Sequence, residues 1–315
     1  MAEPKVIRTV GICGIGQMGA AAAVSFKRGG YQVLLWARDP KKLAAIESTL
    51  ESLDHWLDSH VGGPIQEGGV IRRVEHLEEL DRQADLIMDC IAEDFSQKVD
   101  LFKRLSDAVS RDAIVITTTS GLSITKLGRE SGTALQLAGT HFWNPPHLMP
   151  LVEVIRGEDT PDRVLDRVSE VVTSIGKVPV RVNLDVPGFI GNRLLHAVWR
   201  EAIHLVQRGI ASAEDVDRVA RLTFGLRLPV MGPLENMDLV GLDLVKTIHE
   251  YLLEDLSADQ GPLQTHEQLV RDGNLGVKSG RGFYDWQQRD PQELVERRDR
   301  QIVRQLAYLR ENDMI

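Results

Sequence analysis

The stretch VGICGIGQMGAAAAVSF, residues 10–26, decides the fold. It begins with apolar residues typical of a buried strand, turns through three glycines spaced GxGxxG, and continues into an alanine-rich helical segment. The first glycine permits a tight bend, the second lets the backbone approach a pyrophosphate, and the third lets the helix pack on the strand. Backbone N–H groups at the helix start then face the phosphates. A merely tight strand-to-helix turn is the alternative. The residues predicted to bind a dinucleotide are Gly14, Gly16, Gln17, Met18 and Gly19.

Residues 1–186 alternate short β-branched runs with helical patterns, which is typical of βαβ units and a mostly parallel sheet. We expect strands at 6–13, 32–37, 85–90, 113–118, 136–141, 151–155 and 178–182. We expect helices at 17–28, 40–59, 95–109 and 161–175. This order predicts a Rossmann-type, doubly wound α/β domain.

The pattern changes after the segment DVPG at 185–188, where long helical segments such as 189–208 and 213–223 replace the strands. We therefore predict a dinucleotide-binding domain at 1–186 and an all-helical domain at 187–315. The helical domain is small for a core of its own. We expect it to bind substrate and to pair with a second copy in a homodimer.

Composition excludes several classes of function. The net charge of -9 opposes attraction to nucleic acid or to an anionic membrane surface. The longest apolar runs are too short to cross a bilayer, and the first strand follows no secretion signal, so we expect a cytoplasmic protein. The only cysteines, Cys13 and Cys90, lie in apolar strand-like segments, so we expect neither a disulfide framework nor a metal site.

The end of the second expected strand bears on the choice of cofactor. NAD enzymes with this glycine turn place an acidic side chain there, where it binds the adenosine ribose. Here the position is Ala37, followed by Arg38 and Asp39. Without that carboxylate a 2′-phosphate is not repelled, and a guanidinium can pair with it, so we place NADP(H) ahead of NAD(H). The alternative is that Arg38 is an ordinary surface residue and that Asp39 binds the ribose.

Three further stretches carry a resemblance to a known family. They are TTTSGLSITKL at 117–127, GTHFWNPPHLMPLVEVI at 139–155 and PGFIGNRLL at 187–195. Together they resemble the L-3-hydroxyacyl-CoA dehydrogenase family. The likeness spans nearly the whole chain, because similar elements are AEDFSQKVDLFKRL at 92–105, GPLENMDLVGLDL at 232–244 and KSGRGFYDW at 278–286. It implies an NAD(P)-dependent oxidoreductase that interconverts a 3-hydroxy compound and its 3-oxo form, as in fatty acid metabolism.

The resemblance also implies which residues carry the reaction. It makes His141 the general acid/base and Glu153 its partner, with Ser120 and Asn192 contacting the reacting oxygen. An imidazole that titrates near neutrality suits the transfer of a hydroxyl proton, and a carboxylate on its other nitrogen fixes the tautomer. Expected neighbouring strands can bring His141 and Glu153 together. Alternatively, Glu153 is an ordinary carboxylate at the edge of the sheet. Asn192, in the same way, can be an ordinary polar residue at the start of a helix.

Other positions match the family less fully. Glu93 and Lys98 match residues that contact the nicotinamide half of the cofactor, and an exposed i,i+5 pair is the alternative. A family asparagine near the nicotinamide is Thr118 here. His147, in the proline-rich loop, is a further candidate for touching the substrate.

The substrate is left open between two classes. In the family, a long lysine-bearing helical hairpin after the second strand helps to meet the phosphates of CoA, whereas here the region 41–60 is short, with four acidic residues and two lysines. The NPP after His141 and the stretch 225–239 resemble the branch of L-gulonate 3-dehydrogenase and its crystallin relatives, and 187–210 resembles carnitine dehydrogenase. Both branches act on small 3-hydroxy compounds without CoA. A non-catalytic, crystallin-like dinucleotide-binding protein is the remaining alternative.

Overall fold

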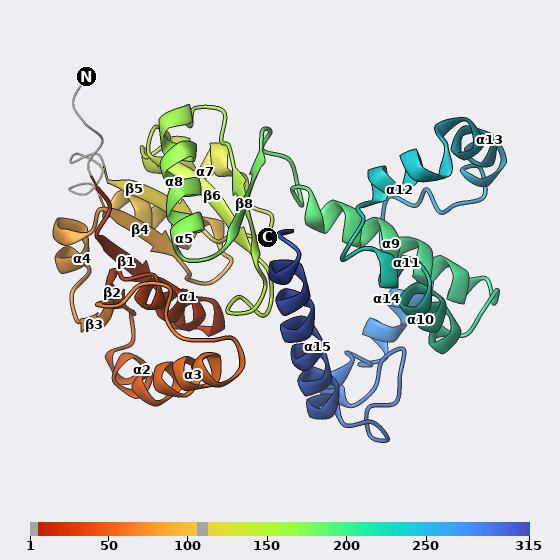
Figure 1. Cartoon of the computed structure of the whole chain (residues 1–315), viewed down its shortest axis with the longest axis horizontal. Coiled ribbons are helices and arrows are strands. Elements are labelled where there is room, and N and C mark those ends of the chain that lie inside the picture. Colours follow the sequence, from red (N-terminus) through yellow and green to blue (C-terminus); the bar gives the residue numbers. More distant parts are fainter. Residues whose placement is uncertain (1–5, 106–112) are drawn as a thin grey trace. The chain divides into compact units, whose positions relative to one another are not determined.

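The computed structural model describes residues 6–105 and 113–315 of the chain (Figure 1). The chain separates into two compact units, residues 1–191 (unit 1) and 192–315 (unit 2). No helix among the described residues is both long and apolar enough to span a membrane.

Unit 1 is built around one sheet with the strand order β3-β2-β1-β4-β5-β6-β7-β8. Its strands are β1 (Thr9–Cys13), β2 (Gln32–Trp36), β3 (Val70–Val74), β4 (Leu86–Asp89), β5 (Ile114–Thr117), β6 (Leu137–Phe142), β7 (Leu151–Ile155) and β8 (Val178–Val182). The first six pair in parallel in the order 3-2-1-4-5-6, which is that of the dinucleotide-binding fold. β7 then runs antiparallel to β6, and β8 is parallel to β7. The predicted Rossmann-type, doubly wound domain is confirmed.

Helices cover both faces of this sheet. They are α1 (Gln17–Arg28), α2 (Pro40–Ala45), α3 (Glu47–His60), α4 (Leu77–Gln83), α5 (Phe95–Lys103), α7 (Ile124–Ser131) and α8 (Asp162–Ser174). Apolar residues of α1, α3 and α8 pack in one core cluster, and those of α4, α5 and α7 pack in a second cluster on the opposite face. Figure 1 shows α2 and α3 (orange) beside α1. Because both faces are covered, the central strands β1, β4 and β5 are apolar over most of their length.

The structure contains elements that the sequence patterns did not predict. β3 (VIRRV) is an edge strand and mostly exposed, and its two arginines hide the apolar signal. The short helices α4 and α7 were also not expected. The helix expected at 40–59 is interrupted at Ile46 and forms α2 and α3. The helix expected at 95–109 is observed as α5, and its positions 106–109 lie outside the described residues.

Unit 2 is helical, as predicted. Its helices are α9 (Gly191–Gln207, starting at the end of unit 1), α10 (Ala213–Leu222), α11 (Phe224–Arg227), α12 (Pro233–Val240), α13 (Leu242–Leu252), α14 (Gln264–Arg271), the short 3-10 helix η1 (Val277–Ser279) and α15 (Pro291–Glu311). None of the helices α9 to α14 contains a buried residue, although each carries large apolar side chains. The apolar surface of this unit is therefore largely uncovered within one chain.

Candidate active site

The turn between β1 and α1 has the geometry that a dinucleotide requires. Gly14 has φ +114°, and a Cβ added there would lie 2.4 Å from the carbonyl oxygen of Cys90. A Cβ on Gly19 would lie 2.0 Å from the carbonyl oxygen of Gly14, so this glycine lets α1 approach the turn. By contrast, a Cβ on Gly16 would meet no described atom within 4 Å. Gly16 is the N-cap of α1 and supplies no side-chain cap to the first N–H groups of the helix, which include those of Gln17 and Met18. These residues fit the phosphates of a bound dinucleotide.

The end of β2 lies where the adenosine ribose is expected. Ala37 is buried and Arg38 is exposed. The Asp39 carboxylate caps α2, where its Oδ1 accepts hydrogen bonds from the backbone N–H groups of Lys41 (3.0 Å) and Lys42 (3.4 Å). Asp39 thus has a structural role as the cap of α2, and both Arg38 and Asp39 are exposed to solvent.

A buried ion pair lies at the carboxyl end of β4. Asp89, its last residue, is fully buried and accepts hydrogen bonds from Lys98 Nζ (2.6 Å), Thr117 Oγ1 (2.7 Å) and the backbone N–H of Ile91 (3.0 Å). The Lys98 side chain is 1% exposed. The alternative of an exposed Glu93–Lys98 pair is therefore wrong for Lys98. The pair ties α5 and β5 to the end of β4, next to the glycine turn.

Glu93 binds the loop that follows β5. Its Oε1 accepts hydrogen bonds from Thr119 Oγ1 and from the backbone N–H of Ser120 (2.9 Å), while its Oε2 lies 3.7 Å from Lys98 Nζ. Thr118 donates from both its N–H and its hydroxyl to the carbonyl oxygen of Asp89. These contacts hold Ser120 at the carboxyl edge of the sheet, where open α/β sheets bind ligands.

His141 and Glu153 are direct cross-strand partners in the antiparallel β6–β7 pair. Partners in this register point to the same face of the sheet, and His141 Nδ1 lies 2.7 Å from Glu153 Oε2. The second carboxylate oxygen, Oε1, accepts hydrogen bonds from the backbone N–H groups of Ile190 (2.8 Å) and Gly191 (3.0 Å). The side chains are only 5% and 2% exposed, so water is largely excluded from the pair.

These contacts set the charge of Glu153 and the tautomer of His141. Burial by itself would raise the pKa of the Glu153 carboxyl, but hydrogen bonds from His141, Gly191 and Ile190 outweigh it and hold that pKa below its ordinary value. An ionised carboxylate can only accept, so His141 Nδ1 must carry a hydrogen. Within 6–105 and 113–191, no hydrogen bond involves the other ring nitrogen, Nε2. In the neutral ring Nε2 has a lone pair, and it can take a proton from a bound molecule.

Aromatic rings and a clamped loop surround this pair. The His141 ring lies 5.0 Å from the ring of Trp143, edge to face, and 5.7 Å from that of Phe189. Phe189 is buried and has φ +49°, a left-handed conformation that costs roughly 1–2 kcal/mol for such a residue. The loop 143–150 is held by Lys177, whose Nζ donates to the carbonyl oxygens of Pro146 and Met149, both at 2.8 Å.

The structure brings some of the predicted residues into direct contact. His141 and Glu153 form one group, and Glu93, Lys98 and Ser120 belong to a second group at the ends of β4 and β5. The ring of His147 contacts Trp56 of α3 edge to face, at 5.6 Å. Asn192 lies in the first turn of α9 and belongs to unit 2. The functional roles of all these residues stay predictions.

Sequence reasoning missed several residues of the site. Asp89 carried a usable signal, because it is a charged residue in an otherwise apolar segment, which calls for a buried partner. The positive φ of Phe189 and the contact of Lys177 with the loop carried none, because both depend on residues distant in sequence.

Comparison with known proteins decides the family. The family description "3-hydroxyacyl-CoA dehydrogenase, NAD binding domain" matches residues 9–186, and "3-hydroxyacyl-CoA dehydrogenase, C-terminal domain" matches residues 188–286. The chain belongs to the 3-hydroxyacyl-CoA dehydrogenase family. It is accordingly an NAD-dependent oxidoreductase of that family, and the resemblance seen in its motifs is confirmed.

Two kinds of family member are similar to the chain. A 5-formyl-3-hydroxy-2-methylpyridine 4-carboxylate 5-dehydrogenase of Mesorhizobium japonicum is 33% identical over 301 residues, covering 95% of this chain and 97% of the relative. A probable 3-hydroxybutyryl-CoA dehydrogenase of Deinococcus radiodurans is 36% identical over 285 residues, covering 88% of this chain and 99% of the relative.

Solved structures show the same two kinds. A crystal structure of the pyridine carboxylate enzyme, described as an NAD+ dependent dismutase, has a TM-score of 0.90 and 32% identity, covering 97% of this chain and 99% of its own. The (S)-3-hydroxybutyryl-CoA dehydrogenase of Ralstonia eutropha has a TM-score of 0.72 and 31% identity, covering 89% and 99%.

Proposed function

We propose that the protein is a dehydrogenase of a small, CoA-free hydroxy or aldehyde compound, in which His141 is the general acid/base and Glu153 its partner. The observation that carries this proposal is the buried His141–Glu153 hydrogen bond of 2.7 Å, with both carboxylate oxygens occupied. Such a pair suits proton transfer to and from an oxygen.

The chemistry follows from the protonation states. When bound, the nicotinamide cofactor would supply the hydride acceptor for oxidation and, in its reduced form, the hydride donor for the reverse reaction. As the alcohol is oxidised, His141 Nε2 takes its hydroxyl proton, and Glu153 stabilises the positive charge that develops on the ring. In the opposite direction the ring returns the proton. The hydrate of an aldehyde has the same H–C–O–H group, so the same proton transfer serves its oxidation to an acid.

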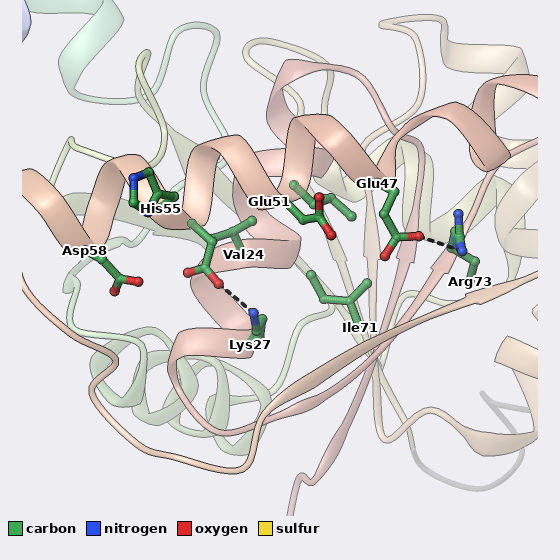
Figure 2. Close-up of a pocket in the computed structure, with 10 residues that line it drawn as sticks. Val24, Lys27, Glu47, Glu51, His55, Asp58, Ile71 and Arg73 are labelled. Carbon is green, nitrogen blue, oxygen red and sulfur yellow. Dashed lines mark hydrogen bonds and ion pairs between the residues drawn. The ribbon is translucent and has the colours of Figure 1, made fainter.

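The surroundings of α3 support a substrate without CoA. The acidic side chains of α3 neutralise the neighbouring cations: Asp54 pairs with Lys27 and with Arg28, Asp58 pairs with Arg28, and Glu47 pairs with Arg73. Figure 2 shows Glu47, Glu51 and Asp58 along this side of the helix, with Glu47 directed to Arg73. The phosphates of CoA would meet acidic groups and cations that are already paired.

The relatives point the same way. The relative from Mesorhizobium japonicum acts, by its name, on a pyridine carboxylate rather than on a CoA ester, and the TM-score of 0.90 for that enzyme exceeds the 0.72 of the 3-hydroxybutyryl-CoA enzyme. Aromatic hydroxy and aldehyde carboxylates therefore come first among the substrates to test. A 3-hydroxyacyl-CoA is the second candidate, because the relative from Deinococcus radiodurans is named for such a substrate.

A paired assay separates the two candidates. Initial rates are followed by nicotinamide absorbance with free hydroxy acids and aromatic aldehyde carboxylates, and with 3-hydroxybutyryl-CoA and acetoacetyl-CoA. We expect a higher kcat/KM for a free compound and no competitive inhibition by CoA alone. A higher kcat/KM for the CoA esters, together with inhibition by CoA, would transfer the proposal to the second candidate.

Substitution of His141 tests the mechanism itself. His141→Ala is expected to lose on the order of a hundred- to ten-thousand-fold in kcat while it keeps its affinity for NADH, measured by calorimetry. His76→Ala, at an exposed position in front of α4, is the matched control and keeps its activity. Near-wild-type turnover by His141→Ala would contradict the proposed mechanism and would favour the alternative of a non-catalytic dinucleotide-binding protein.

The remaining site residues complete the proposal. Ser120 and Asn192 contact the reacting oxygen, and Glu93 and Lys98 serve the nicotinamide half of the site. Lys98 does so through Asp89, because its ammonium group is already buried against that carboxylate. Use of NADP(H) is supported by Ala37, by the exposed Arg38 and by the capping role of Asp39, whereas the description of the related dismutase names NAD+.

We also propose a homodimer formed through unit 2. Its helices expose large apolar residues, among them Leu234 and Leu239, which are 73% and 75% exposed. An obligate homodimer interface resembles a domain core cut in half, and unit 2 lacks such a core in one chain, so a second copy of the same surface is the partner that completes it. Light scattering on the purified protein should give twice the mass of the chain. A monomeric mass would contradict the proposal.

A further inference from the structure

Gly191 contacts both members of the His141–Glu153 pair, one directly and one through Trp143. Its N–H donates to Glu153 Oε1 at 3.0 Å. A Cβ built on Gly191 would lie 2.2 Å from Cζ2 of Trp143 and 3.0 and 3.1 Å from the two carbons bonded to it. Real side chains do not approach so closely, so the indole ring occupies the volume that a side chain at 191 would need.

Trp143 in turn contacts the imidazole. It follows His141 by two residues at the end of β6, and its ring meets that of His141 edge to face, with centroids 5.0 Å apart and an interplanar angle of 66°. Trp143 is only partly buried, and the neighbouring loop 143–150 is held by Lys177. Toward Gly191 the indole has no spare room, because a Cβ at that position would overlap its ring.

We propose that Gly191 and Trp143 form an interlock that positions the proton-handling pair. The missing side chain at 191 lets the indole ring lie against His141, and at the same time lets the 191 backbone come close enough for its N–H to reach Glu153. Both are positioning residues, since they act through His141 and Glu153. This inference rests on the proposed function, because it takes that pair as the acid/base of the reaction.

The interlock predicts a specific pattern of activity in a double-mutant cycle. A methyl group at 191 must displace either the indole or the backbone N–H, and a displacement of about 1 Å at a reacting group can lower the rate on the order of a hundredfold. Gly191→Ala is therefore expected to lose on the order of a hundredfold in kcat, with little change in KM for NAD. Trp143→Phe removes the outer ring that contains Cζ2, keeps an aromatic side chain beside His141, and is expected to lose less activity.

The decisive variant is Gly191→Ala/Trp143→Phe. With the outer ring gone, the methyl group has room, so the double variant should recover most of the kcat lost by Gly191→Ala, and its pH profile should return to that of Trp143→Phe. Losses that simply multiply in the double variant would overturn the interlock. Gly63→Ala is the matched control, since Gly63 has an ordinary φ and a Cβ there meets no described atom within 4 Å.

Two further outcomes are distinguishable. If Gly191→Ala gives no folded protein, the double variant carries the test alone: a folded, active double variant supports the interlock, and an unfolded one refutes it. If His141→Ala is as active as the wild type, the proposed function fails whatever the variants at 191 do. An inactive His141→Ala with a fully active Gly191→Ala refutes only the interlock.

Discussion

Replacement of Glu153 by glutamine tests how the carboxylate controls His141. Glutamine has the same shape but only one acceptor oxygen, whereas Glu153 accepts from His141 on one oxygen and from the N–H groups of Ile190 and Gly191 on the other. If the amide NH2 faced the two backbone donors, both would be left unpaired in a buried site, at about 1–3 kcal/mol each. If the amide oxygen faces them instead, both bonds are kept.

The second orientation is therefore favoured, and it reverses the tautomer of the His141 imidazole. The amide NH2 then donates to His141 Nδ1, so the ring hydrogen moves to Nε2, which can no longer take a proton from substrate. A tautomer error of this kind lowers kcat on the order of ten-thousand-fold in hydrolases with an analogous carboxylate–histidine pair. We therefore expect Glu153→Gln to keep its fold and its affinity for NADH, and to lose at least a thousandfold in kcat, on the order of that effect.

The assay uses the best substrate of the wild type, with stopped-flow detection of NADH in a single turnover, so that slow product release does not hide the step. Thermal unfolding and NADH binding serve as controls for folding. A kcat within tenfold of the wild type, roughly 1.4 kcal/mol of barrier, would refute the reasoning about the tautomer.

Three further predictions concern residues of unit 1. Lys98→Met should destabilise the protein by about 3–5 kcal/mol in urea unfolding, because it leaves Asp89 charged and unpaired in the core; an unchanged midpoint would show that the pair is unimportant. Arg38→Ala should raise KM for NADPH more than KM for NADH, and equal effects would argue against a bound 2′-phosphate. The lowered pKa of Glu153 contributes stability above the ordinary glutamate pKa of about 4.3, and this is lost as pH falls through the lower folded value. Wild type should therefore lose more unfolding free energy than Glu153→Gln on acidification, and parallel curves would exclude that contribution.

Much of unit 1 could be predicted because its signals are local. A pattern within a few residues is enough to predict several elements. These are the glycine turn, the apolar strands β1, β4 and β5, and the amphipathic helix α8. The strand β3 could not be found in this way, because an exposed edge strand with two arginines has no alternating apolar pattern. Nor could the burial of Lys98, because nothing within its own helix neutralises it, and its partner Asp89 ends a separate strand.

The sequence by itself determined the dinucleotide turn, since the conformation of Gly14 and the close approach of Gly19 follow from backbone sterics within a dozen residues. Through its resemblance to the family, the sequence also identified His141 and Glu153 as a pair. Only the tertiary structure decided how that pair is held. The antiparallel register of β6 and β7 makes them partners, and the backbone of Ile190 and Gly191, far along the chain, occupies the second carboxylate oxygen. The state of a buried ionisable group depends on every donor and charge around it, and chain folding, rather than local sequence, brings those groups together.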